Sequence, residues 1–385
     1  MGYLLAVPGL LAGTGAAALD SPSGPGRDAA TARVSIHIRS DHLTLRVAKA
    51  PQVYLSGNFG TEAVRQVQRL LGEGKIPPGS DVYLDSSSGD VASGMALGRL
   101  FRAARLNTHL GAWREASRHG MPARPATCLD ACAYAWLGGL YRWSPSGADR
   151  IGLHEALLPD RADAAPGTPA PQALRDYMQS MDVRQEYFAQ VLGPAVDGVV
   201  WWNAEKMAPW LVANNGRLPL TASYAPSPGA PTLVLTQVVR GGQNRIELQC
   251  ASGQVTLTAY DTVGEARARQ LAARAVYAYF EVDRQAWDPR HGERPHTEGD
   301  ALVFARRMPF VQLAPLLRTV SLGAWVEIAG SPVRLGFSLA PVAVAKLTQP
   351  FYASCLALQP GAKPAANPAK RARPSFWKRI FGRPS

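Results

Sequence analysis

Three short segments of the sequence carry residues whose types and spacing suit acid–base or acyl-transfer chemistry. Residues 84–91 (LDSSSGDV) contain a turn at Gly89, residues 128–132 (CLDAC) place Asp130 between two cysteines, and residues 150–154 (RIGLH) end on His154. Acyl transfer needs an activated nucleophile, a base within hydrogen-bond reach and donors for the developing oxyanion. Asp130 and His154 are therefore candidate reacting groups, and Gly89 allows backbone N–H groups to point into a site without an intervening side chain.

The elements that must position these residues alternate between strands and helices. Short apolar runs at 53–56, 82–84, 108–112 and 150–154 predict strands. Helical stripes follow Thr61 and Asp90, which are candidate N-caps, and a small-residue helix is predicted over 131–139. This alternation indicates an α/β fold with a largely parallel sheet covered by helices.

The order of the three segments resembles that of the ClpP/crotonase superfamily. It looks closest to bacterial ClpP-like proteins, predicted to be periplasmic, that carry a Cys-x-Ser-Ala-Cys signature, and the likeness covers roughly residues 50–215. The resemblance implies a ClpP/crotonase-like core with parallel strands and covering helices. It also implies an oxyanion hole formed by the N–H groups of Gly89 and Ala131, and a general base at His154.

Two departures from the family pattern bear on activity. Asp130 stands where the family has its catalytic serine, and a carboxylate cannot be converted into an alkoxide by a histidine. A negative group there would also repel an oxyanion in the adjacent hole. Ser87-Ser88-Gly89 stands where the family prefers Pro-Gly-Gly. We therefore expect a degenerate serine-hydrolase domain that is not an active serine peptidase and that acts in binding or scaffolding.

An alternative hypothesis is a hydrolase or acid/base enzyme that uses Asp130 and His154, with an oxyanion hole at Gly89 and Ala131. Geometry separates the two hypotheses. The enzyme needs Asp130 and His154 to face each other at an open pocket, whereas in a binding protein the loop 155–171 would fill that pocket.

Other polar residues near the motifs have simpler explanations. Neighbouring serines suit turn and helix-cap hydrogen bonds better than a nucleophilic role, namely Ser86, Ser87, Ser88 and Ser93. Asp182 and Asp197 lie downstream, where a third triad member would be sought, but both fit helix-surface charges.

The four cysteines suit two disulfides, with four reduced thiols as the alternative. Cys128 and Cys132 lie four residues apart, and Cys250 and Cys355 both fall in the second half of the chain. One bridge in each domain would suit an oxidising compartment. No histidine stands at ligand spacing from the first pair, so we expect no metal site, and we expect no cofactor.

The N-terminal residues favour export. Residues 1–18 contain a short apolar run followed by Ala16-Ala17-Ala18, the small-x-small pattern of a signal peptide, although a positive segment before the run is missing. Residues 19–32 fit a linker. We therefore expect a periplasmic or cell-envelope protein, the alternatives being a disordered Ala/Gly-rich N-terminus or an uncleaved anchor.

The length of 385 residues fits two domains. We expect a ClpP/crotonase-like domain over 33–215 and a strand-rich α+β domain over 228–360. The finer pattern predicts a strand pair at 33–38 and 43–47, and one helix over about 171–192.

The basic character of the chain belongs mostly to its tail, residues 361–385. This segment holds seven cations and no acid, which accounts for most of the formal charge of +12. Its cations and aromatic residue suit an anionic membrane surface: Lys370, Arg371, Arg373, Trp377, Lys378 and Arg379. A solvated tail is the alternative, and nucleic acid is not an expected partner. The other expected partners are a peptide or small-molecule ligand and, by resemblance, further copies of the chain.

Overall fold

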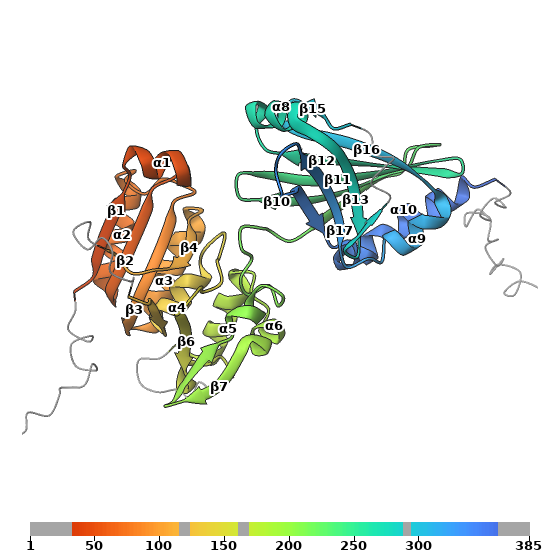
Figure 1. Cartoon of the computed structure of the whole chain (residues 1–385). Coiled ribbons are helices and arrows are strands. Elements are labelled where there is room, and N and C mark those ends of the chain that lie inside the picture. Colours follow the sequence, from red (N-terminus) through yellow and green to blue (C-terminus); the bar gives the residue numbers. More distant parts are fainter. Residues whose placement is uncertain (1–32, 115–123, 161–168, 288–293, 361–385) are drawn as a thin grey trace, which may run out of the picture. The chain divides into compact units, whose positions relative to one another are not determined.

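The computed structural model describes residues 33–114, 124–160, 169–287 and 294–360 (Figure 1). The chain divides into two compact units, residues 1–213 and 214–385. The segments expected to be a signal peptide, a linker and a basic tail lie outside the described residues. None of the helices in the described ranges is both long and apolar enough to cross a membrane.

The first unit is built on one mixed sheet. Its strands follow the order β1-β2-β3-β5-β6-β8-β7, and β4 pairs with the first half of β3. Pairing is parallel from β2 through β6, while β1, β8 and β7 join antiparallel. The strands are β1 (Ser35–Arg39), β2 (Gln52–Phe59), β3 (Asp81–Gly89), β4 (Asn107–Leu110), β5 (Thr127–Leu129), β6 (Arg150–His154), β7 (Leu192–Val196) and β8 (Val199–Trp202).

Helices pack against this sheet, as the alternation predicted. They are α1 (His42–Ala48), α2 (Thr61–Gly72), α3 (Val91–Ala103), α4 (Ala131–Leu137), α5 (Pro171–Ser180), α6 (Gln185–Val191) and α7 (Ala204–Met207). Side chains alternate along the strands, so Leu55 and Leu84 enter the core while Tyr54 and Tyr83 stack on the other face with ring centroids 4.8 Å apart. The α/β prediction for this unit is confirmed in this coarse form.

Three local predictions in the first unit were wrong. Residues 43–47 form part of helix α1, because the side chain of Asp41 accepts the N–H of Thr44 at 3.0 Å and caps a helix. Gly60, not Thr61, is the N-cap of α2. The helix expected over 171–192 is two helices, α5 and α6, separated by a turn in which Asp182 has a φ of 56°.

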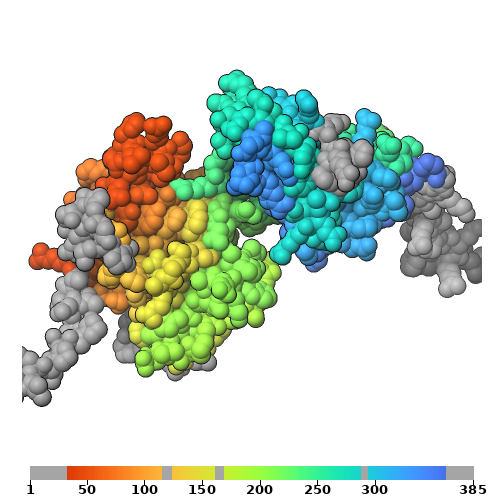
Figure 2. Space-filling view, in the orientation of Figure 1, coloured from red at the N-terminus to blue at the C-terminus, as the bar shows by residue number. Residues whose placement is uncertain are grey.

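Helix α1 carries an apolar surface that its strand-like sequence pattern explains. Leu43 and Val47 are 68% and 73% exposed on this helix, which forms the red-orange surface of the first unit in Figure 2. An alternating apolar pattern fills one face of a strand, but on a helix it spreads around the circumference. Local capping therefore prevailed over the strand-like pattern.

The second unit is strand-rich, and every strand pair described in it is antiparallel. A six-stranded sheet has the order β15-β16-β12-β11-β10-β9, and a four-stranded sheet has the order β14-β13-β17-β18. The strands are β9 (Thr221–Ala225), β10 (Thr232–Val239), β11 (Gly242–Ala251), β12 (Gln254–Thr262), β13 (Ala275–Val282), β14 (Gln285–Trp287), β15 (His296–Glu298), β16 (Ala301–Pro309), β17 (Leu322–Ile328) and β18 (Leu335–Leu339).

Three helices, α8 (Glu265–Arg274), α9 (Leu313–Leu316) and α10 (Ala345–Ala357), complete the second unit. A disulfide between Cys250 on β11 and Cys355 on α10 lies within its hydrophobic core. The bridge therefore joins the start of the unit to its end.

Candidate functional site

The three sequence segments meet at one edge of the sheet of the first unit. Strand β3 pairs with β5 at Ser86 and Cys128, and β5 pairs with β6 at Leu129 and Gly152. These strands run parallel, so their carboxyl ends share an edge. Gly89 ends β3, Asp130 follows β5, and His154 ends β6.

Asp130 occupies a sharp turn between β5 and α4. Its φ of 49° and ψ of −104° lie outside the regions that non-glycine residues ordinarily adopt. Two backbone hydrogen bonds hold it there: its N–H donates to the carbonyl of Gly152 at 3.2 Å, and its carbonyl accepts the N–H of Tyr134 at 3.0 Å. Such backbone strain is concentrated at functional sites in proteins.

The Asp130 carboxylate holds His154 at two points. Oδ1 accepts the backbone N–H of His154 at 2.8 Å, and Oδ2 lies 2.6 Å from Nδ1 of its ring. An ionised carboxylate only accepts hydrogen bonds, so Nδ1 must carry the proton. In the neutral ring, Nε2 then has the lone pair. The His154 side chain is 50% exposed and that of Asp130 is 18% exposed, so the histidine is the accessible member of the pair.

The backbone at the two predicted oxyanion-hole residues is tightly packed. Gly89 has a φ of 137°, and a Cβ on it would lie 2.5 Å from the carbonyl oxygen of Phe59. A Cβ on Gly94 of α3 would lie 2.2 Å from the carbonyl oxygen of Ala131. Only glycine fits at positions 89 and 94. Close packing therefore fixes the backbone of Gly89 at the end of β3 and of Ala131 at the start of α4.

The hydroxyl of Ser86, near this edge, makes structural hydrogen bonds. The Ser86 hydroxyl lies 2.5 Å from the Gly57 carbonyl and 2.9 Å from the Ser88 carbonyl. Asp90 caps α3 by accepting the N–H of Ser93 at 2.7 Å, as predicted. Asp182 pairs with Arg102 at 2.7 Å. Asp182 is thus engaged in another contact rather than with His154.

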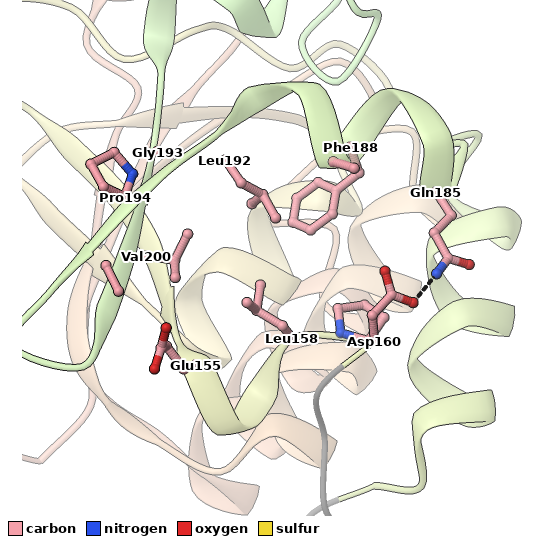
Figure 3. Close-up of a pocket in the computed structure, with 12 residues that line it drawn as sticks. Glu155, Leu158, Asp160, Gln185, Phe188, Leu192, Gly193, Pro194 and Val200 are labelled. Carbon is pink, nitrogen blue, oxygen red and sulfur yellow. Dashed lines mark hydrogen bonds between the residues drawn. The ribbon is translucent and has the colours of Figure 1, made fainter.

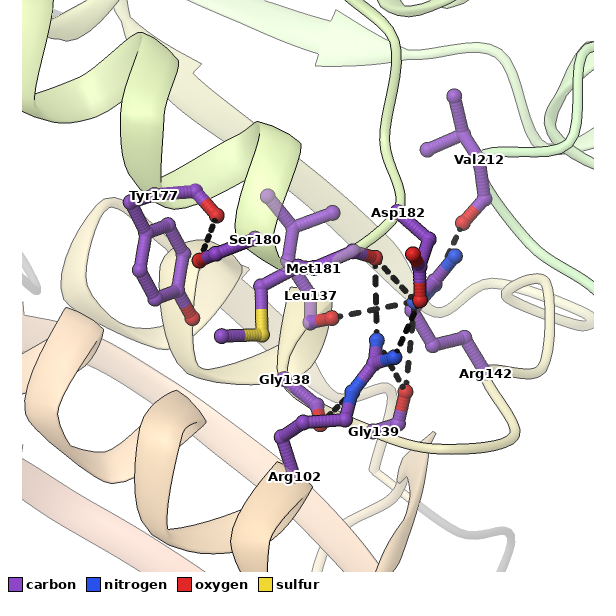
Figure 4. A network of polar contacts seen from close by, with 10 residues as sticks. All are labelled: Arg102, Leu137, Gly138, Gly139, Arg142, Tyr177, Ser180, Met181, Asp182 and Val212. Carbon is purple, nitrogen blue, oxygen red and sulfur yellow. Dashed lines mark hydrogen bonds and ion pairs between the residues drawn. The ribbon is translucent and has the colours of Figure 1, made fainter.

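Two arginines fix the far end of α4, the helix that begins after Asp130 (Figure 4). Arg102 donates to the carbonyls of Gly138 and Gly139, both at 3.2 Å. Arg142 donates to the carbonyls of Leu137 at 3.3 Å and Val212 at 2.8 Å. Carbonyl groups at a helix C-terminus have no partner within the helix and carry partial negative charge, so cations stabilise them.

Burial, with the Arg102 cation nearby, lowers the pKa of Arg142 to about 9, so its guanidinium still carries its charge at neutral pH. The buried hydroxyl of Tyr177 on α5 donates to the carbonyl of Tyr134 at 2.5 Å. Burial raises the pKa of Tyr134, and the negative charge of Asp130 adds to the effect. Helix α4 is thus held along its length, which gives Asp130 a rigid base.

A cavity of about 260 Å³ lies beside the segment that follows His154 (Figure 3). Leu158 and Phe188 point into it, and carboxylates of Glu155 and Asp160 lie on different sides of it. Asp160 accepts a hydrogen bond from Gln185. The described part of the loop 155–171 therefore borders a cavity, which neither Asp130 nor His154 lines.

Both predicted disulfides are present. Cys128 and Cys132 bridge across Asp130 with a Cα–Cα distance of 5.1 Å, and Cys250 bridges to Cys355. Within the described residues, no group of three or more His, Cys, Asp or Glu side chains could hold a metal ion. His296 instead pairs with Glu298 at 3.1 Å.

Sequence reasoning missed the arginine network and the cavity. An isolated arginine, Arg142, in the apolar run 137–143 is a signal for a buried polar network. The cavity is lined in part by α6, which the sequence pattern did not separate from α5, and by the β7–β8 hairpin, for which no strands were predicted. No protein-family model matches the chain, and no curated protein matches it. The geometry of this edge of the sheet is therefore what bears on function.

Proposed function

We propose that the first unit is a ClpP/crotonase-type domain that has lost serine-peptidase chemistry and uses Asp130 and His154 as an acid–base pair. The observation that carries the proposal is the two-point contact of the Asp130 carboxylate with the backbone N–H and Nδ1 of His154, at 2.8 and 2.6 Å. The partly exposed ring is then oriented with Nε2 as the acceptor, ready to take a proton from water or from a bound ligand.

Asp130 acts on His154 rather than on substrate. In hydrolytic triads a carboxylate on Nδ1 fixes the tautomer of the histidine and stabilises the imidazolium that forms. Both carboxylate oxygens of Asp130 already accept hydrogen bonds from His154, which argues against a nucleophilic role. The nucleophile would be a water molecule deprotonated by Nε2 of His154. The N–H groups of Gly89 and Ala131 are the proposed donors to the oxyanion.

Binding without catalysis is the second candidate, and the cavity favours it. Its 260 Å³ is the size of a side chain or a small molecule, and its walls are apolar with two carboxylates. A peptide or small-molecule ligand held there would contact Glu155, the residue that follows His154 in the chain. In this role the carboxylates of Glu155 and Asp160 would supply the charged contacts to the ligand.

Both proposed functions are compatible with a location outside the cytoplasm. Two disulfides in a chain of this size support an oxidising compartment, in the periplasm or cell envelope. The basic tail, by its composition, would contact anionic lipid. Sedimentation with anionic vesicles tests this part: the full chain should pellet more than a chain ending at residue 363, and equal partitioning would contradict it.

Two assays on the intact protein test the catalytic proposal. A serine-directed fluorophosphonate should label the Asp130→Ser variant and leave the wild type unlabelled. Hydrolysis of a panel of nitrophenyl acyl esters should depend on His154 and be lost in His154→Gln, while Ser87→Ala should retain it. Labelling of the wild type, or ester hydrolysis that survives His154→Gln, would overturn the proposal. Binding of ligands without any turnover would favour the second candidate.

A further inference from the structure

Asp130 differs from the two other aspartates that precede helices in the described part of the chain. Asp41 and Asp90 have φ values of −65° and −102°, and each caps its helix by accepting the N–H three residues on, at 3.0 and 2.7 Å. Asp130 also stands at an N-cap, but its φ is 49° and its side chain makes no capping bond. Its carboxylate contacts His154 instead.

The carboxylate of an aspartate at this position can therefore make one of two sets of hydrogen bonds. In the ordinary extended conformation its carboxylate would accept N–H groups in the first turn of α4, as Asp90 does for α3. In the conformation observed, the carboxylate leaves those N–H groups and holds His154. Rotation of the backbone at 129–131 converts one arrangement into the other. Something must favour the strained arrangement over the capped one.

The Cys128–Cys132 disulfide is placed to make that choice. It joins the strand before Asp130 to the first turn of the helix after it, leaving only residues 129–131 between the two bridged positions. Both cysteines are fully buried. The arginine network fixes the other end of α4, and the bridge closes a short ring around the turn at its start, which contains Asp130.

We propose that the Cys128–Cys132 disulfide is a positioning element that selects the His154-bound conformation of Asp130 over the helix-capping one. The inference rests on the proposed function in that it concerns the same acid–base pair. Reduction by a dithiol would add two electrons and two protons to the bridge, giving two thiols and the oxidised dithiol. The freed turn then relaxes, Asp130 caps α4, and His154 loses its partner at Nδ1.

The test follows the ring nitrogens of His154 by NMR in the full chain. In the wild type, the ¹⁵N shifts of His154 should report a protonated Nδ1, and its backbone amide should carry the signature of a hydrogen bond to a carboxylate. In Cys128→Ser/Cys132→Ser, both signatures should be lost. Removing the other bridge with Cys250→Ser/Cys355→Ser is the matched control and should leave the His154 signals unchanged.

A purely structural bridge gives a different result. It would lower the melting temperature while leaving the His154 signals of a folded Cys128→Ser/Cys132→Ser protein as in the wild type, and that outcome would overturn the inference. If the serine variant does not fold, Cys128→Val/Cys132→Ala places apolar side chains at the same buried positions and is read in the same way.

Activity is a second and separate readout. Where the wild type hydrolyses an ester, loss of the bridge should lower kcat at least 10-fold with little change in KM, because the oriented histidine acts in the chemical step. An inactive wild type would contradict the proposed function, while the NMR comparison would still decide whether the bridge positions Asp130.

Discussion

Arg102 and Arg142 both donate to the carbonyl oxygen of Met181, each at 3.0 Å. Met181 is the C-cap of α5, so two cations from different parts of the first unit converge on one helix terminus. The same guanidinium groups also hold the carbonyls that end α4. The helix that carries the proposed site, α4, is thereby tied to α3 and α5. The donors are arginine side chains, and the acceptors are backbone carbonyls.

Replacing Arg142 should therefore destabilise the first unit. Arg142→Met removes the arginine donor from the carbonyls of Leu137 and Val212, which Arg102 does not contact, and we expect the free energy of unfolding to fall by about 3 kcal/mol. Arg65→Met is the control, because its ion pair with Glu62 is exposed and should change stability by less than about 0.5 kcal/mol. Urea denaturation measures both. Equal effects for the two variants would contradict a structural role for the network.

Gly94 should not tolerate a side chain. Alanine there would place its Cβ 2.2 Å from the carbonyl oxygen of Ala131, so α3 and α4 would have to separate. We expect Gly94→Ala to cost about 2 kcal/mol or more of stability. Gly72→Ala is the matched change at the end of α2, where the added Cβ would meet no neighbouring residue within 4 Å. This variant should raise stability by about 0.5 kcal/mol. Thermal melts of the pair test this, and a neutral Gly94→Ala would show that the helices can adjust.

Asp130 and His154 should behave as one unit in kinetics. Asp130→Asn offers a single acceptor oxygen where two N–H groups of His154 now donate, so the ring would lose its fixed tautomer. Any ester hydrolysis by the wild type should then fall by roughly 10²- to 10⁴-fold. The double variant with His154→Gln should be no worse than His154→Gln alone. Fully additive losses would mean that the two residues act independently.

The stability of the second unit should depend on pH through Asp261. Burial raises the pKa of this carboxyl from 3.8 to about 6 in the folded protein, so the folded state holds its proton more tightly than the unfolded state does. Stability should therefore fall as pH rises from about 4 to about 6. Asp261→Asn should remove this dependence and raise stability at pH 7 by about 2 kcal/mol.

Asp283 provides a control of opposite sign. Its pKa is lowered, chiefly by the hydrogen bond from the Thr319 hydroxyl, so its charge stabilises the fold above pH 3.8. Asp283→Asn should weaken the unit at pH 7 and have less effect in acid. Urea titrations of both variants from about pH 2.5 to pH 7 measure these slopes, because the Asp283 contribution is lost only below about pH 3.8. A parent protein with no slope between pH 4 and pH 6 would contradict the assignment to Asp261.

Sequence patterns predicted much of the first unit because its signals are local. The strand–helix alternation and the Asp90 cap follow from residues close to each motif, whereas the contact of Asp130 with His154 was only a hypothesis that the geometry had to decide. Helix α1 was mistaken for a strand because Leu43, Leu45 and Val47 alternate, whereas the decisive signal was one cap at Asp41. An amphipathic pattern indicates which side chains could be buried. In a short segment, a helix cap can determine the secondary structure even where the apolar pattern favours a strand.

The arginine network and the cavity could not be predicted in the same way. Arg102 and Arg142 act on backbone carbonyls, and no side-chain pattern in the sequence marks those acceptors. The cavity depends on how α6 and the β7–β8 hairpin pack near Glu155, which are contacts between segments distant in the sequence. The unusual φ of Asp130 also lay beyond prediction, because an aspartate in this context is an ordinary helix cap.

The spacing of the two disulfides sets an order in time for oxidation of the chain. Cys132 follows Cys128 after four residues, whereas Cys355 follows Cys250 after 105. In a chain exported N-terminus first, Cys128 and Cys132 would reach the oxidising compartment together, whereas 105 residues separate the arrival of Cys250 from that of Cys355. Early closure of the first bridge removes both of its thiols from competition, leaving Cys250 and Cys355 to find only each other.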